Sequence, residues 1–231
     1  MSQRYAIYFA PAKESPWWVL GSRWLGRDEF DSTPLLATGF PSLSLDEQQR
    51  ITMEPCRYGF HATLKAPFRL AGCQTAEDLI TRTQALAASL APVPLGPLQV
   101  QSLGPFVALI PAAEPAGLAA LAQCCVVGLD DLRAPLTEQD LARRKRELLD
   151  TRELELLHRY GYPYVLERFC FHFSLTGVVD LPTQQRVIQA VQEPVAHLNA
   201  VAPLVLDRLC LFMEPAPGSP FKRIADVELS A

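Results

Sequence analysis

Histidine is scarce in this chain of 231 residues, and the patterns that bind metals or form disulfide frameworks are missing. The sequence has four histidines and six cysteines, with no C-x-x-C pair and no histidine at ligand spacing from a cysteine. Neither a zinc site nor a set of disulfides is therefore indicated. We expect a protein that uses no metal and no cofactor.

Long apolar runs are absent as well. No stretch is both long and apolar enough to cross a bilayer, and Met1-Ser2-Gln3-Arg4 leads into a strand-like segment instead of a signal-peptide core. These features predict a cytoplasmic protein without a membrane partner. Because 49% of the residues are hydrophobic and 20% are charged, a chain of this length can bury a sizeable core.

A surplus of positive charge is also missing. Lysine and arginine number 21 against 25 acidic residues, which gives a net charge of −4. Proteins that follow a nucleic-acid backbone need a broad basic surface, so extended nucleic acid is not the expected partner. The dense basic run at residues 143–146 is followed by acidic residues and fits a solvated helix face. A small phosphorylated substrate agrees better with this charge. We also expect a monomer, an expectation for which the sequence carries no signal of its own.

One short pattern, in contrast, occurs twice. Phe60-His61-Ala62-Thr63-Leu64 and Phe171-His172-Phe173-Ser174-Leu175 both have the form F-H-x-[ST]-L, whereas His158 and His197 lack it. Side chains alternate faces along a strand, so each motif histidine shares a face with the hydroxyl residue two positions on. The intervening residue and the leucine point to the other, packed face. Two such strands brought together would place two imidazoles and two hydroxyls around one cleft.

These four side chains suit chemistry on a phosphate ester. His61 and His172 would act as general base and general acid, because an imidazole pKa of about 6.5 allows both protonation states near neutrality. Thr63 and Ser174 would donate hydrogen bonds to phosphate oxygens, where charge accumulates in the transition state. The sequence leaves open which histidine is the acid, and whether the reaction runs as hydrolysis or ligation.

Five further residues are candidates for contacts with the substrate. Lys65 and Thr176 continue the alternation of the two motifs, so each would lie on the same face as the histidine before it. Lys65 would add positive charge at the rim of the cleft, with an exposed strand-end lysine as the alternative. Thr176 precedes a glycine and would equally serve a turn. Tyr5, Tyr8 and Arg168 could bound the substrate, with a structural role as the alternative for each.

The motifs and their flanks resemble a known family. Two widely separated H-x-[ST] motifs are similar to those of the 2H phosphoesterase superfamily, whose members act on cyclic phosphates and 2'-5' phosphodiesters. The likeness to its bacterial branch associated with phosphonate metabolism, the DUF1045-like proteins, is carried by Arg4–Pro11, Gly59–Phe68, Gly161–Leu166 and Phe171–Gly177. It covers most of the chain, and Ser174 stands where many relatives have threonine.

The resemblance implies a fold and an activity. The fold is a bilobal α+β domain over residues 1–231, with two pseudo-twofold-related lobes of antiparallel sheet flanked by helices, each contributing one motif strand to a central cleft. The activity is metal-independent hydrolysis of a small cyclic phosphate or phosphodiester, such as a phosphorylated ribose derivative in phosphonate catabolism. A 2'-5' RNA ligase or RNA-end cyclic phosphodiesterase, and a non-catalytic binder of a phosphorylated metabolite, remain the alternatives.

Local patterns also predict an α+β chain. Strands are expected over 5–9, up to 64, and over 98–103, 106–110, 204–213 and 221–229. Helices are expected from Pro16 behind Ser15, from Thr75 to about 90, over 115–127, from Thr137, from Thr151, and over 182–198. A loop rich in proline, serine and glycine is expected before the first motif. Hairpin-like strand pairs alternating with helices favour antiparallel sheets over a doubly wound parallel sheet.

Overall fold

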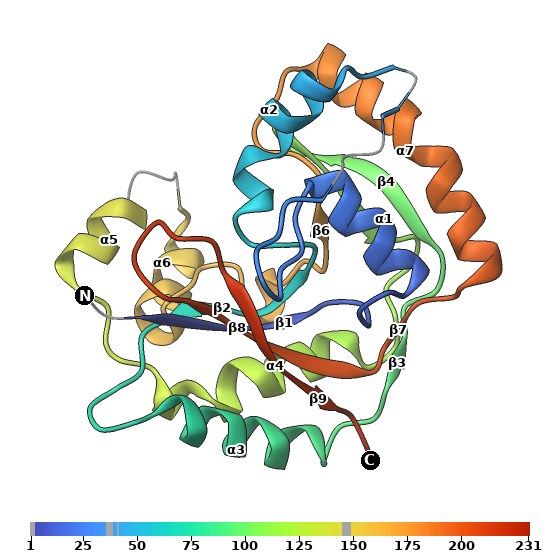
Figure 1. Ribbon diagram of the computed structural model, residues 1–231. Coiled ribbons are helices and arrows are strands. Elements are labelled where there is room, and N and C mark those ends of the chain that lie inside the picture. The colour runs from blue at the N-terminus through green and yellow to red at the C-terminus, as the bar shows by residue number, and fades with distance from the viewer. Residues whose placement is uncertain (1–2, 36–38, 41, 145–148) are drawn as a thin grey trace.

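The computed structural model describes residues 3–35, 39–40, 42–144 and 149–231 (Figure 1). The larger strands are β1 (Arg4–Phe9), β2 (Ala62–Phe68), β4 (Leu98–Leu103), β5 (Phe106–Pro111), β8 (Arg208–Glu214) and β9 (Lys222–Glu228). Two-residue strands are β3 (Val93–Pro94), β6 (Phe173–Ser174) and β7 (Val205–Leu206). The helices are α1 (Pro16–Leu25), α2 (Leu45–Cys56), α3 (Ala76–Ala87), α4 (Leu118–Gly128), α5 (Glu138–Arg144), α6 (Thr151–Tyr160) and α7 (Leu181–Val201).

The strands form an antiparallel sheet, as the sequence predicts, so the described chain is an α+β protein. Seven strands lie in the order β4-β5-β6-β2-β1-β8-β9, and each neighbouring pair is antiparallel. Strands β3 and β7 form a separate two-stranded sheet. The two strands that carry the motifs, β2 and β6, are neighbours in the middle of the large sheet.

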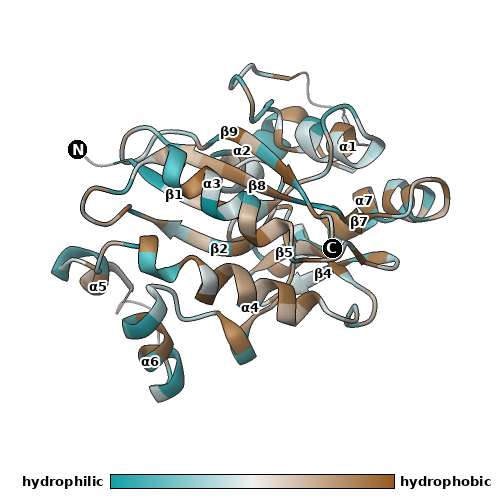
Figure 2. Cartoon of the chain, turned by 90° about the horizontal axis from the view of Figure 1, so that it is seen from below, coloured by the Kyte–Doolittle hydropathy of each residue, from teal (hydrophilic) through white to brown (hydrophobic). Residues whose placement is uncertain are grey.

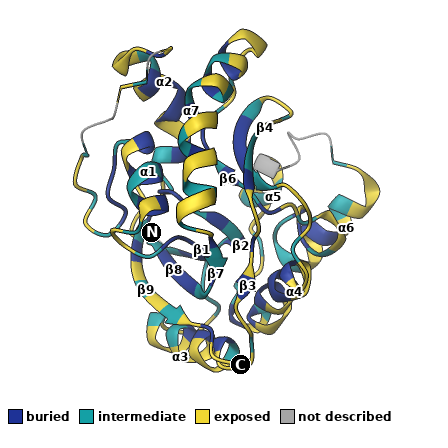
Figure 3. Ribbon diagram, turned by 90° about the vertical axis from the view of Figure 1, so that its right-hand side faces the viewer, coloured by how far each residue is buried: buried dark blue, intermediate teal, exposed yellow. Residues whose placement is uncertain are grey.

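Alternation along β1 separates two buried clusters. Tyr5, Ile7 and Phe9 belong to the main core, whereas Ala6 and Tyr8 belong to a smaller cluster on the other face. Helices α3 and α4 pack against β8, β9 and β2, and α7 packs against β4 and β5. Figure 1 shows α3 and α4 below the central strands, Figure 2 shows the same helices from below, and Figure 3 shows α7 beside β4. The main core lies between this sheet and its helices.

Capping residues set most helix starts where the sequence predicts them. The hydroxyl of Ser15 accepts a hydrogen bond from Trp18 N, and Thr75 forms a capping box with Asp78. Helix α6 differs by one residue, because Asp150 caps it and Thr151 is already helical. Such a shift arises because aspartate and threonine are both good caps when they stand side by side.

Two predicted boundaries are wrong. The segment expected to be a loop before the first motif contains helix α2, whose N-terminus is capped by Ser44 and which tolerates Pro55 in its last turn. The first motif strand continues beyond Leu64 as far as Phe68, because β1 supplies a partner along that whole length. Part of the basic run at 143–146 lies outside the described residues.

Two expectations about composition can be compared with the described chain. All six cysteines are free thiols in this structure. In the residues that the structure describes, no helix combines the length and the apolar character needed to span a bilayer.

Candidate active site

The two motif strands meet where Ala62 pairs with Phe173 in antiparallel register. Both residues are fully buried in the main core, and Leu64 and Leu175, two positions further along each chain, are buried in the same cluster. The packed side of each motif is therefore the side that the sequence predicts. Since neighbouring residues of a strand face opposite ways, the histidine and hydroxyl residues face away from this core.

The antiparallel pairing sets the histidine of each motif against the hydroxyl residue of the other motif. When the Ala62–Phe173 register is extended by one residue in each direction, His61 falls opposite Ser174, and Thr63 falls opposite His172. Each imidazole thus lies beside the hydroxyl of the other motif as well as its own. The two histidines are diagonal neighbours, a relation in which Cα atoms are about 7–8 Å apart and long side chains still meet.

A cleft of about 420 Å³ opens over these side chains. Its described lining comprises Arg4, Tyr8, Arg57, Tyr58, His61, Thr63, Ala66, Pro67, Tyr162, His172 and Ser174. All four motif residues that the sequence indicates therefore face one cleft, and Tyr8 joins them. The lining holds two arginines and no carboxylate among the described residues, so the cleft favours an anion.

Both imidazoles are held in the same way. Nδ1 of His61 lies 2.9 Å from the carbonyl oxygen of Gly59, and Nδ1 of His172 lies 2.9 Å from that of Cys170. A carbonyl oxygen only accepts hydrogen bonds, so Nδ1 of each ring carries a proton and Nε2 is the nitrogen that titrates. Nε2 of His61 lies 3.3 Å from Oγ1 of Thr63. Each ring is thus oriented to exchange a proton through Nε2.

Both histidines have lowered pKa values. Burial lowers the pKa of His61 to about 4, and the nearby charges of His172 and Arg27 act in the same direction. Burial also lowers the pKa of His172. The ring of Tyr8 contributes to the shielding of His61, because the two rings stack with centroids 3.8 Å apart. At neutral pH both imidazoles are mainly neutral when the cleft holds no anion.

Two glycines shape the backbone that leads into the first motif. Gly59 has a φ of +82°, and a Cβ at this position would lie 2.8 Å from Cβ of Glu29. Gly21 in α1 lies against the ring of Phe60, which a Cβ would meet at 2.0 Å. Glycine is required at both places, by the left-handed backbone at one and by the close approach at the other. This packing positions the carbonyl that orients His61.

Two arginines in the cleft were not indicated by the sequence. Arg4 from β1 and Arg57 from the end of α2 both form ion pairs with Glu214 of β8. Burial alone would raise the pKa of Glu214, but hydrogen bonds from Arg4 and the Gly218 amide, with the charge of Arg4, hold that pKa below its usual value. The pairing of β1 with β8 sets Arg4 opposite Glu214, and Arg57 reaches the same carboxylate from the end of α2.

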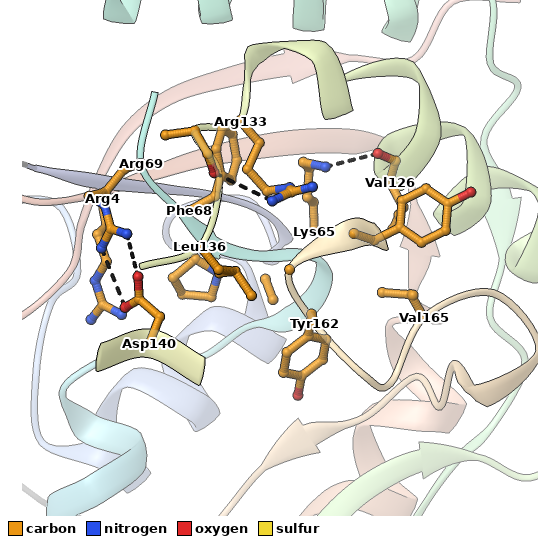
Figure 4. Close-up of a pocket in the computed structure, with 15 residues that line it drawn as sticks. Arg4, Lys65, Phe68, Arg69, Val126, Arg133, Leu136, Asp140, Tyr162 and Val165 are labelled. Atoms are coloured by element: carbon orange, nitrogen blue, oxygen red, sulfur yellow. Dashed lines mark hydrogen bonds and ion pairs between the residues drawn. The ribbon is translucent and has the colours of Figure 1, made fainter. Parts of the chain in front are cut away.

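Lys65 does not line the cleft, contrary to the expectation from strand parity. Tyr8 pairs with Thr63, but Ile7 pairs with Lys65, so a β-bulge inserts one residue into β2 and turns Lys65 to the core face. Its Nζ donates to the Val126 carbonyl at 2.8 Å and forms an ion pair with Asp130 at 3.0 Å. Figure 4 shows Lys65 in a small pocket beside the cleft, with its ammonium directed at Val126.

The other three candidates also lie outside the cleft itself. Tyr5 is buried on the core face and its hydroxyl donates to Oε1 of Gln3. The hydroxyl of Thr176 accepts a hydrogen bond from Val107 N at 3.0 Å, and the residue lines an apolar pocket that adjoins the motifs. Arg168 pairs with Asp150 at 2.6 Å and lines a third pocket together with His172. Thr176 and Arg168 therefore border the region around the histidines.

Metal ligands are not gathered in this region. Among the described residues, no three His, Cys, Asp or Glu side chains lie close enough together to hold a metal ion. The chemically active groups of the cleft are imidazoles, hydroxyls, phenols and guanidiniums.

Comparison with known proteins identifies the family. The sequence model described as "Protein of unknown function (DUF1045)" matches residues 63–222, so the chain belongs to the DUF1045 family. A protein of Janthinobacterium sp. (strain Marseille) named "Ribose 1,5-bisphosphate phosphokinase PhnN" is 38% identical over 221 residues, which are 94% of this chain and 49% of that protein. A protein of the same name from Laribacter hongkongensis (strain HLHK9) is 35% identical over 222 residues, 95% of this chain and 50% of that protein. The chain spans about half the length of these curated relatives.

Proposed function

We propose that this member of the DUF1045 family is a two-histidine phosphoesterase that hydrolyses a small cyclic phosphate or phosphodiester. The observation that carries the proposal is the antiparallel pairing of Ala62 with Phe173, which sets His61 and His172 diagonally on one face. Two imidazoles with Nε2 directed into one anion-favouring cleft supply a general base and a general acid for the same phosphorus atom.

The proposed reaction transfers two protons. Water attacks phosphorus in line with the leaving oxygen, and Nε2 of one histidine takes the proton that the water loses. The ester P–O bond breaks, and Nε2 of the other histidine gives its proton to the departing sugar oxygen. Thr63 and Ser174 donate hydrogen bonds to the non-bridging oxygens, where negative charge accumulates. The products are a phosphate monoester and a hydroxyl group.

Substrate binding supplies the acid in this scheme. Both imidazoles have lowered pKa values, so the free protein holds few protonated rings at neutral pH. A phosphate anion between the rings favours the charged form and raises the pKa of the histidine beside it. The site therefore gains its general acid when the anion enters.

The relatives and the resemblance to the phosphonate-associated branch support a proposal for the substrate class. The curated relatives carry the name of a kinase of ribose 1,5-bisphosphate, which suggests a phosphorylated ribose for this chain as well. The sequence has no G-x-x-x-x-G-K-[ST] segment, the loop that cradles nucleotide phosphates in P-loop kinases. We infer that phosphokinase activity belongs to the part of the relatives that this chain does not cover.

The sheet supports a two-lobed, single-domain interpretation of residues 1–231. Strands β2, β1, β8 and β9 with α3 and α4 form one half, and β4, β5 and β6 with α7 form the other. The halves join through the short pairing between β2 and β6, and each contributes one motif. In this proposal the two halves are the pseudo-twofold lobes of a 2H phosphoesterase.

A turnover assay tests the proposal. The purified chain is incubated with ribose 2,3-cyclic phosphate, nucleoside 2',3'-cyclic phosphates and a 2'-5' dinucleotide, and phosphorus NMR follows conversion of each to a monoester. We expect hydrolysis of at least one small cyclic phosphate by the parent and loss in His61→Ala and His172→Ala. Tight binding without turnover of any of them would instead support the non-catalytic binder, and turnover restricted to RNA ends would support the RNA-directed alternative.

A further inference from the structure

Arg4 and Arg57 line the same cleft as the histidines, and both are held there by Glu214. Arg4 is four residues before Tyr8 on β1, and a strand rises about 3.3 Å per residue, which places their Cα atoms about 13 Å apart. The imidazole of His61 stacks on Tyr8. Arg4 cannot fold back along the cleft, because its Nε is held by Glu214, the residue directly opposite it in β8.

The two guanidiniums share a single carboxylate. Glu214 is 1% exposed, while the side chains of Arg4 and Arg57 are 15% and 31% exposed and line the cleft. One carboxylate neutralises one of the two positive charges, which leaves the group with a net charge of about +1. The bond from Arg4 to Glu214 uses Nε, and within the described part of the chain its two terminal nitrogens have no hydrogen-bond partner.

Rigid, partly buried arginines with spare donors suit the binding of an oxyanion. Guanidinium donors match phosphate and carboxylate oxygens in pairs, and such charge-assisted bonds are about twice as strong as neutral ones. Glu214 fixes both side chains before a ligand arrives, so little side-chain freedom is lost on binding. The separation from the histidines means that the anion bound here differs from the phosphate that reacts.

We propose that Arg4 and Arg57 bind a second anionic group of the substrate, a phosphate or carboxylate that a sugar-sized spacer separates from the reacting phosphate. This inference rests on the proposed function for the position of the reacting phosphate. It assigns the cleft to doubly anionic substrates, such as a ribose cyclic phosphate that carries a further phosphate. The histidines act on one phosphate while the arginines fix the other end of the molecule.

The test compares ligands that differ only in one phosphate. Turnover is measured on adenosine 2',3'-cyclic phosphate with and without a 5'-phosphate, and binding is measured by calorimetry with adenosine 3',5'-bisphosphate and adenosine 3'-phosphate. The proteins are the parent, Arg57→Gln, Arg57→Lys and, as a matched control, Arg82→Gln, whose exposed partner is Asp131 on another part of the surface. Thermal unfolding checks that each variant is folded.

The second phosphate should raise kcat/KM and affinity by roughly ten- to hundredfold in the parent and in Arg82→Gln. In Arg57→Gln that preference should shrink toward unity, and Arg57→Lys should restore part of it. The inference would be overturned if the parent showed the same kcat/KM and affinity with and without the second phosphate. An unchanged preference in folded Arg57→Gln would also overturn it. If the binding preference follows this pattern but neither these nucleotides nor ribose 2,3-cyclic phosphate is hydrolysed, the second anion site stands and the hydrolytic function fails.

Discussion

The phenol ring of Tyr8 lies nearly flat on the imidazole of His61, with 3.8 Å between the ring centroids and 26° between the planes. Tyr8 is itself 1% exposed, so it excludes water from one face of the imidazole. Exclusion of water disfavours the imidazolium and is the main reason why the pKa of His61 falls to about 4. The contact between Tyr8 and His61 therefore affects the pH range in which the proposed catalyst is active.

We predict a bell-shaped pH dependence of kcat/KM centred below pH 6.5. One imidazole must be neutral and the other protonated, and kcat/KM reports the pKa values of the free enzyme. Below about pH 4 His61 is protonated, and above the lowered pKa of His172 both rings are neutral, so activity falls on both sides. Tyr8→Ala should move the acidic limb to higher pH, whereas Tyr8→Phe keeps the ring and the limb. A flat profile between pH 4 and 8 would contradict the two-histidine mechanism.

The alternation of the two motifs could be derived from the sequence because it depends on nothing beyond strand geometry. Ala62 and Phe173 face the core and their neighbours face the cleft, as period-two patterning requires. Caps such as Ser15 and Thr75 are equally local, since the side chain that caps a helix stands next to it in the sequence.

Features that depend on partners remote in sequence could not be derived. The alternation predicted for Lys65 is wrong because a bulge in the β1–β2 pairing adds one residue, which becomes visible only when β1 is placed beside β2. Arg4 and Arg57 join the site only through Glu214, more than half the chain away. Helix α2 did carry a local signal, Ser44 followed by acidic residues, but its proline obscured the helical pattern.

Replacement of either histidine by alanine should remove a general catalyst. We expect kcat of His61→Ala and of His172→Ala to fall roughly a hundred- to ten-thousandfold. The double variant should be scarcely slower than the single ones, because groups that act as a unit are not additive. His158→Ala, outside the motifs, is the control and should keep parental turnover. Folded His61→Ala and His172→Ala proteins with parental rates would disprove the assignment.

Gly21→Ala should destabilise the protein, because Gly21 packs against Phe60, the first residue of the first motif. A Cβ there would lie 2.0 Å from the Phe60 ring, which is itself fully buried, so the ring and helix α1 must move apart. Overpacking of this kind costs about 1–3 kcal/mol. Gly39→Ala is the control, because no atom of the described residues lies within 4 Å of the added carbon. Denaturant unfolding should show the difference, and equal midpoints for the two variants would refute the packing argument.

Chelation of metal ions should leave the activity intact. In the described part of the chain no group of three ligand-type side chains could hold an ion, and the proposed proton transfers use imidazoles alone. Turnover is measured before and after extensive dialysis against EDTA, and again with added Mg²⁺, Mn²⁺ or Zn²⁺. If chelation abolished activity and one of these ions restored it, the reaction would need a metal ion that the two-histidine mechanism does not include.

The hydroxyls of Thr63 and Ser174 should matter less than the imidazoles beside them. Replacing either residue by alanine removes one hydrogen bond to a phosphate oxygen but no proton transfer, so kcat should fall by roughly ten- to a hundredfold for each. The register places each hydroxyl opposite the histidine of the other motif, so the two losses should be similar. Thr63→Ser and Ser174→Thr keep the donor and should retain most activity. A Thr63→Ala variant as slow as His61→Ala, with Thr63→Ser equally slow, would mean that the threonine holds the imidazole in place and that hydrogen bonding to phosphate is not its role.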